Sequence, residues 1–210
     1  MTDPRRPPPD LSVTDFFGTW LHQAFAHAGR QGLAGAPSVR VTLSGAAGGD
    51  WRVRAAEDGL EVAALAPGPS QGPEHIDVWL RQSAADFLAA FHGDPDLPDL
   101  LPAGWTALDL LFLDPRDVAM LDQMSGRIVL EIHGKRRRRW TLDLAFGKDG
   151  INAGRARATV QIDGTTYDGL RTRTMAPMQA LLGGKVKIDG DRTLAMKALM
   201  LTAQRLGRAT

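Results

Sequence analysis

The 210-residue chain contains no cysteine, which excludes disulfides, thiolate catalysis and Cys-ligated zinc or iron–sulfur sites. It also lacks an excess of charge of either sign, because Lys and Arg total 25 and Asp and Glu total 24. Such a balance provides no general attraction for nucleic acid or for an anionic membrane. No apolar run approaches the roughly 18 residues of a spanning helix, and the N-terminus lacks the apolar region of a secretory signal. We therefore expect a soluble, cytoplasmic protein without stable membrane insertion and without a nucleic-acid partner.

Motifs of catalysis and metal binding are missing as well. The five histidines show no zincin spacing. Asp94, Asp96 and Asp99 are separated by prolines and lack the closing Glu of a calcium loop. No nucleophile elbow, Gly-rich phosphate loop or kinase signature occurs. We expect no catalytic residue, metal or cofactor, and a protein that is not an enzyme, although catalytic groups need to be neighbours only in space.

Hydrophobic periodicity predicts alternating helices and strands behind a proline-rich leader at 1–10, which we expect to be disordered. Apolar side chains at helical spacing predict an amphipathic helix over 13–28 that begins at the cap Ser12. Further helices are predicted after the caps Ser83 and Thr174, over 115–124 and over 192–206. Period-2 alternation predicts strands at 39–43, 51–55, 60–64, 76–80, 128–132, 140–144, 160–162 and 185–188.

The two halves of the chain can be aligned with each other. Residues 39–51 match residues 128–140 at one constant spacing, apolar for apolar, Gly for Gly and Trp for Trp, and Ser83 then aligns with Thr174. The match predicts an internal duplication, with a first unit at 11–124 and a second at 125–210. We expect an α+β fold in which each unit is an antiparallel-rich sheet covered by helices on one face. The helix at 115–124 could close the first unit or open the second.

Two further features are candidates for ligand contact. The cationic run from Lys135 to Arg139 falls at an expected hairpin tip, where it is either simply solvated or contacts a lipid headgroup or phosphate through Arg136 and Arg138. Methionines gather in the C-terminal segment, which favours either an ordinary core or a space that adapts to apolar ligands of varied shape.

The C-terminal signature of the sterol carrier protein 2 family resembles two stretches of this chain, ALLGGKVKIDGD at 180–191 and LAMK at 194–197. In that family a short helix leads into Gly-Lys-x-Lys-Ile-x-Gly-Asp, and the next helix opens with Leu-Ala-Met-Lys. The resemblance covers 126–206 well and 12–124 more loosely. It implies two tandem sterol-carrier-like units, the second closer to the family pattern.

The resemblance also implies a function, the non-catalytic binding or transfer of an apolar lipid such as a fatty acyl chain, a sterol-like molecule or a phospholipid. The ligand would occupy a tunnel between the sheet and the C-terminal helices, lined by Met175, Met178, Leu181, Leu182, Val186, Ile188, Leu194, Ala195, Ala198 and Leu199. In the first unit, bulky Trp105 replaces a lysine of the signature and Phe87 and Phe91 replace apolar lining residues, which indicates a closed structural partner.

Two alternatives stay open. The chain could be an accessory protein that presents a lipid or quinone-precursor substrate to a partner enzyme, or a fold with a filled core and a purely structural role. The partners expected are accordingly an apolar small molecule and, beyond it, an enzyme or a second copy of the chain.

Overall fold

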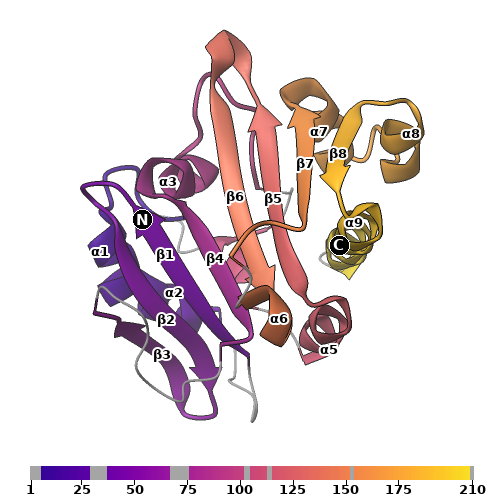
Figure 1. Cartoon of the computed structure of the whole chain (residues 1–210). Coiled ribbons are helices and arrows are strands. Elements are labelled where there is room, and N and C mark those ends of the chain that lie inside the picture. Colours follow the sequence, from indigo (N-terminus) through magenta and orange to yellow (C-terminus); the bar gives the residue numbers. More distant parts are fainter. Residues whose placement is uncertain are drawn as a thin grey trace.

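A single mixed sheet spans both halves of the chain. The computed structural model describes residues 6–28, 37–66, 76–101, 105–112, 115–151 and 154–208. Within these residues eight strands pair in the order β3-β2-β1-β4-β6-β5-β7-β8 (Figure 1). The strands are β1 (Ser38–Ser44), β2 (Gly49–Ala56), β3 (Gly59–Ala64), β4 (Val78–Ser83), β5 (Gly126–His133), β6 (Arg139–Phe146), β7 (Ala158–Asp163) and β8 (Val186–Gly190). The α+β class and the antiparallel-rich sheet are confirmed, because only the β1–β4 and β5–β7 pairs are parallel among the described strands.

The same three-strand arrangement occurs in each half. β1 pairs antiparallel with β2 and parallel with β4, just as β5 pairs antiparallel with β6 and parallel with β7. The two arrangements are joined where β4 pairs antiparallel with β6. The halves therefore share one sheet, and the division at 124/125 into two units stays a prediction.

The structure corrects one part of the internal alignment. Ser44 is the register partner of Ser83, and the equivalent position His133 is the partner of Asp163. Each of these partners ends its strand and caps a helix, since the Ser83 side chain accepts from the Asp86 N–H and the Asp163 side chain from the Thr166 N–H. The counterpart of Ser83 is thus Asp163 rather than Thr174.

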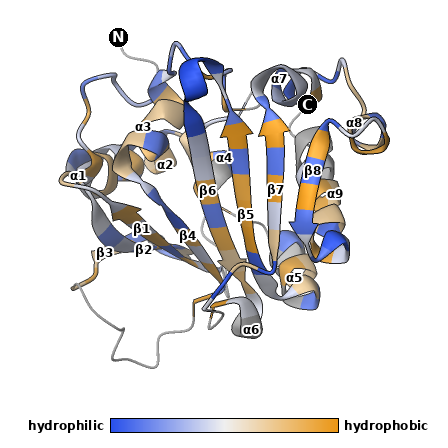
Figure 2. Ribbon diagram, turned by 45° about the horizontal axis from the view of Figure 1, so that its top comes forward, coloured by the Kyte–Doolittle hydropathy of each residue, from blue (hydrophilic) through white to orange (hydrophobic). Residues whose placement is uncertain are grey.

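Helices cover the apolar face of the sheet. They are α1 (Val13–Asp15), α2 (Leu21–His27), α3 (Ala84–His92), α4 (Ala107–Leu111), α5 (Pro115–Met124), α6 (Gly147–Ile151), α7 (Gly164–Arg171), α8 (Pro177–Leu182) and α9 (Arg192–Arg208), with a π-helical turn η1 (Phe16–Trp20) and a 3-10 turn η2 (Lys135–Arg137). Contacts place α3 against β1, β4 and β6, α7 against β5 and β7, and α9 against β7 and β8. Figure 2 shows the period-2 bands of apolar and polar residues along β5, β7 and β8 that produce the two different faces.

The helix predicted over 13–28 packs into the hydrophobic core of this chain. Ser12 caps it as expected, and α1, η1 and α2 follow without a break. The π-helical turn widens the helix so that the neighbouring rings of Phe16 and Phe17 both point inward. Phe17 stacks on Trp51 with the ring centres 4.4 Å apart, and Phe16 lies 5.2 Å from Phe87. The apolar face of this helical segment therefore packs against the sheet and α3.

The N-terminal leader is described only in part, because residues 1–5 lie outside the described residues. Pro7 is buried, and the carbonyl of Pro8 accepts a hydrogen bond from the Leu11 N–H at 3.1 Å. Pro7 thus contacts the domain while Arg6, Pro9 and Asp10 are exposed, and the disorder of the leader stays a prediction.

The opposite face of the sheet is polar and carries a row of alternating charges. The guanidinium group of Arg40, the register partner of Trp79 on β1, lies 4.5 Å from the centre of the Trp79 ring. The guanidinium group of Arg81, two residues farther along β4, lies 4.4 Å from the same ring. Arg40 also binds Asp50 through Nε at 3.0 Å, and Arg81 contacts Asp143 at 3.4 Å. These pairs neutralise the charges on this face.

Candidate functional site

The C-terminal signature builds a compact unit from β7, α7, α8, β8 and α9. Sequence reasoning placed one helix after Thr174, but two helices occupy this region, and α7 had not been predicted. The α8 helix begins at Pro177 behind Ala176, and Thr174 instead contacts the carbonyl of Gly169 at 3.3 Å. Proline at the first helical position fixes the start of α8 without a side-chain cap.

The Gly-Asp pair of the signature has a clear structural role. Gly190 has φ +87, and a Cβ there would lie 2.2 Å from the carbonyl oxygen of Arg157. Asp191 then donates its backbone N–H to that same carbonyl at 2.8 Å and caps α9 by accepting from the Leu194 N–H at 2.9 Å. The pair therefore turns the chain from β8 into α9 and ties this turn to the start of β7.

The electrostatics of the turn agree with its geometry. The backbone N–H of Leu194 and, beyond it, the guanidinium of Arg157 hold the pKa of Asp191 below its usual value. Arg157 Nη2 lies 2.5 Å from the Asp191 carboxylate. The carboxylate is thus a structural anion, charged at neutral pH and already bound by its neighbours.

The predicted lining residues divide into three groups by exposure. Three of them, Val186, Leu194 and Ala195, are buried, with Ala195 fully enclosed. The partly buried group consists of Met175, Leu181, Ile188, Ala198 and Leu199. Met178 and Leu182 are exposed, by 53% and 81%, on the outer side of α8. The expected residues thus differ in exposure, and their role as the lining of one tunnel stays a prediction.

Few contacts hold α8 onto the domain. Ala180 is its only buried residue. The carbonyl of Ala180 accepts from the Lys185 N–H at 2.9 Å, and that of Leu181 from the Gly184 N–H at 3.1 Å. Apart from Ala180, the partly buried Leu181 also packs against the core, so this helix of six residues has little apolar burial to resist displacement.

None of the expected lining residues can take up or release a proton in the physiological range. Helix α7, which contacts α8, carries Tyr167, whose hydroxyl donates to the carbonyl of Leu100 at 2.6 Å. Burial raises the pKa of Tyr167 to about 12, so the phenol is neutral. Within the described part of the chain no His, Asp and Glu side chains gather into a metal-binding group. The arrangement offers apolar surface and shape rather than acid–base chemistry.

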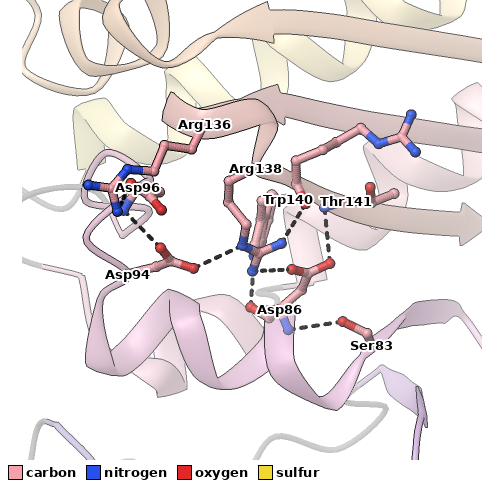
Figure 3. Close-up of polar contacts among 9 residues, drawn as sticks. Ser83, Asp86, Asp94, Asp96, Arg136, Arg138, Trp140 and Thr141 are labelled. Atoms are coloured by element: carbon pink, nitrogen blue, oxygen red, sulfur yellow. Dashed lines mark hydrogen bonds and ion pairs between the residues drawn. The ribbon is translucent and has the colours of Figure 1, made fainter.

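The cationic run forms a hairpin tip, as expected, but its members differ in role (Figure 3). Arg138 reaches back to the body, where it pairs with Asp86 at 2.6 Å and Asp94 at 2.9 Å. The backbone N–H of Asp96 and then the guanidinium of Arg138 lower the pKa of Asp94. Arg138 is thus held by two carboxylates, whereas the side chain of Arg136 is 84% exposed.

A hollow beside α3 was not anticipated from the sequence. It has a volume of about 550 Å³, and its lining includes Asp86, His92, Asp94 and Arg138. Burial lowers the pKa of His92, partly offset by the hydrogen bond that its ring donates to the carbonyl of Pro8. The imidazole therefore links α3 to the packed end of the leader.

The fold and the site define an α+β protein with an apolar, non-titratable candidate site at its C-terminal helices. Residues 107–202 match the model of the SCP-2 sterol transfer family. This match agrees with the resemblance that the signature at 180–191 predicted. The matched range begins at α4 and includes α5, which the expected boundary at 124/125 had left in the first unit. No described helix is both long and apolar enough to cross a bilayer.

Individual relatives cover only parts of the chain. Hydroxysteroid dehydrogenase-like protein 2 of Xenopus tropicalis is 32% identical over 77 residues, which is 35% of this chain. The match spans only 18% of that relative's length. Sterol carrier protein 2 from Yarrowia lipolytica has a TM-score of 0.33 at 17% identity, over 45% of this chain and 77% of its own. The sterol carrier protein domain 2 of Helicoverpa armigera has a TM-score of 0.32 at 21% identity, over 42% and 74%.

Proposed function

We propose that the C-terminal half binds an apolar lipid without chemical conversion, between the sheet and helices α8 and α9, and releases it elsewhere. The ligand is a fatty acyl chain, a sterol-like molecule or a phospholipid. The family match of residues 107–202 supports this class of ligand. The site offers what such a ligand needs, which is apolar surface without titratable groups.

One observation carries the proposal. Among the described residues, the large apolar side chains that are exposed are Met178, Leu182 and Met200, and all three lie on α8 or α9. Two of them, Met178 and Leu182, lie one helical turn apart on α8, and exposed apolar side chains gathered on one short helix mark an interaction site. Methionine adds adaptability, because its flexible thioether packs against ligands of different shape.

The energetics of such binding are adequate. Removing one methylene group from water contributes about 0.8 kcal/mol. An acyl chain of about 16 carbons gains on the order of 10 kcal/mol before the cost of immobilising it. Burial of the α8 side chains against the ligand adds to this gain.

The weak attachment of α8 provides a route for entry. Lifting the helix exposes chiefly Ala180 and the partly buried Leu181. The small side chains of Ala180, Ala195 and Ala198 leave space for a chain between helix and sheet once α8 moves. The exposed Met178 and Leu182 then close over the ligand instead of facing water.

The test is palmitate binding by native mass spectrometry and calorimetry, with solvent extraction of the purified protein. We expect one ligand per chain. Met178→Ser and Leu182→Ser should each weaken binding on the order of 10-fold, because each loses the burial of one large apolar side chain. Met200→Ser is the matched control, since Met200 is 58% exposed but outside the predicted lining.

Two results would contradict this proposal. One is a wild-type protein that neither carries nor takes up an acyl chain, sterol or phospholipid. The other is an equal loss of affinity in Met200→Ser and in the α8 variants, which would move the site away from α8.

A second function, presentation of an apolar substrate to a partner enzyme, is favoured by one finding. The similar segment of the Xenopus relative is a small part of a longer protein named for a dehydrogenase. An arrangement in which the lipid-binding module serves an enzyme would require a stable complex. Copurification of one enzyme in stoichiometric amount, in place of a bound lipid, would favour this function over free transfer.

A further inference from the structure

We infer that the hairpin tip at 135–137 and helix α8 form one docking edge for an anionic lipid bilayer. The inference rests on the proposed function, since a lipid carrier must meet the membrane that it loads from or delivers to. The occupant is a membrane surface rich in anionic headgroups, and it is recognised by exposed cations beside exposed apolar side chains.

The first observation is an unbalanced cationic tip. Lys135, Arg136 and Arg137 are exposed, and the side chain of Arg136 is 84% accessible. Its only ion pair given by the described residues is a contact with Asp96 at 3.8 Å, near the limit for such pairs. Three further carboxylates of this region are bound by other residues of the hairpin, since Asp86 and Asp94 pair with Arg138 and Glu131 contacts Arg139 at 3.6 Å.

The second observation is that the tip is a braced structure. The Lys135 N–H donates to the carbonyl of Asp96 at 2.7 Å, and the Arg138 N–H donates to the carbonyl of Lys135 at 2.8 Å. Arg138 anchors the base of the tip to α3 and the loop behind it (Figure 3). The cations are therefore presented on a fixed support, which reduces the entropy lost when they contact a surface.

The third observation concerns the backbone of the tip. Arg136 has φ 48 and Arg137 has φ 64, so both occupy the left-handed region. Glycine is the residue that adopts this region without steric cost, and long side chains there are uncommon. Arginine nevertheless occupies both adjacent positions, in spite of the conformational cost of the left-handed backbone. This choice of residue favours a role for the two guanidinium charges at the tip.

The fourth observation brings the tip and α8 together. β5 and β7 are parallel, and their last residues, His133 and Asp163, are register partners. The tip follows β5 and α7 follows β7, so the tip, α7 and α8 project from the same end of the sheet (Figures 1 and 2). This end therefore presents cations together with Met178 and Leu182, and exposed Lys185 follows α8. Basic residues beside apolar anchors are the combination that attaches proteins to anionic membrane interfaces.

The experiment is cosedimentation of the ligand-free 210-residue chain with phosphatidylcholine vesicles that contain or lack phosphatidylserine, at low and near-physiological salt. We expect binding that requires phosphatidylserine and weakens with salt. The triple variant Lys135→Gln, Arg136→Gln, Arg137→Gln should lose binding by roughly fivefold per charge, on the order of 100-fold in all.

A matched control removes three cations elsewhere. Arg54, Arg155 and Arg192 are exposed and lie at the opposite end of the sheet, on β2, before β7 and after β8. Their triple change to Gln alters the net charge equally but should leave vesicle binding within about twofold, because these side chains lie farther from the surface than a Debye length. Leu182→Asp tests the apolar part, and should weaken vesicle binding by adding a negative charge and removing an anchor.

Three results would overturn the inference: equal losses in the tip variant and its control, equal binding to vesicles with and without phosphatidylserine, or tip-dependent binding to single-stranded RNA with none to vesicles. Palmitate uptake is measured separately without vesicles. Loss of uptake with intact vesicle binding would count against the proposed function, and the reverse result against the docking edge.

Discussion

The turn at Gly190 allows a sharp test of how the signature sequence acts. In Gly190→Ala the new Cβ would lie 2.2 Å from the Arg157 carbonyl oxygen, at a residue with φ +87. Left-handed backbone costs a non-glycine residue about 1–2 kcal/mol. Relief of the clash adds about 1–3 kcal/mol of strain and weakens the Asp191 N–H bond to Arg157, worth about 1 kcal/mol. We expect a loss of about 4 kcal/mol in the free energy of unfolding.

A control for this change lies in the same signature. Gly184 has φ +67, but a Cβ there would meet nothing within 4 Å. Gly184→Ala should therefore show only the conformational cost, about 1 kcal/mol. In thermal unfolding followed by circular dichroism, the midpoint should fall by about 8–16 °C for Gly190→Ala and about 2–4 °C for Gly184→Ala. Equal shifts for the two variants would refute the close approach to Arg157 as the reason for glycine.

Two further predictions concern the region around α3. Arg138→Met should lower the free energy of unfolding by about 2 kcal/mol, because it leaves the carboxylates of Asp86 and Asp94 without their shared cation. The neighbouring change Arg137→Met should alter it by no more than about 0.5 kcal/mol. Urea unfolding measures both values, and similar values would show that Arg138 is merely a surface charge. His92 has a folded-state pKa below its unfolded value of 6.5, so its neutral form contributes stability above that pH, which is lost as the pH falls. His92→Gln should flatten the decline in unfolding free energy between about pH 7 and pH 5, and an unchanged slope would exclude His92 as a cause.

Local patterns in the sequence were sufficient to predict most of the sheet. The alternation at 39–43 and 128–132 marks β1 and β5 because the apolar residues of each strand lie on the face that packs into the core, and Ser12 and Ser83 cap their helices as their spacing indicates. The signature at 180–191 indicated the β8–α9 turn, since its Gly-Asp pair fulfils a purely local requirement.

Features that depend on tertiary contacts were harder to predict. Asp163-Gly164 resembles a turn, and only the register of β7 on β5 shows that Asp163 caps α7. Thr174 resembles a cap, but its hydroxyl bonds to α7 instead. The internal alignment slipped at this point for the same reason.

The candidate site was only partly predictable. Apolar identity does not distinguish Leu194, which packs in the core, from Leu182, which faces water, because both occur in the same signature. The division depends on how α8 sits on the sheet. The different roles of Arg136 and Arg138 likewise depend on Asp86 and Asp94, which lie far away in the sequence.

The pairing of β4 with β6 has a consequence for how the chain can be divided. Along Val78 to Arg81, the first half covers an edge that the second half would otherwise leave open. An edge strand whose backbone groups are unpaired is a template for pairing with other chains. By pairing with β6, the first half therefore prevents this strand from pairing with other chains. We expect a fragment that begins at residue 125 to self-associate through β6.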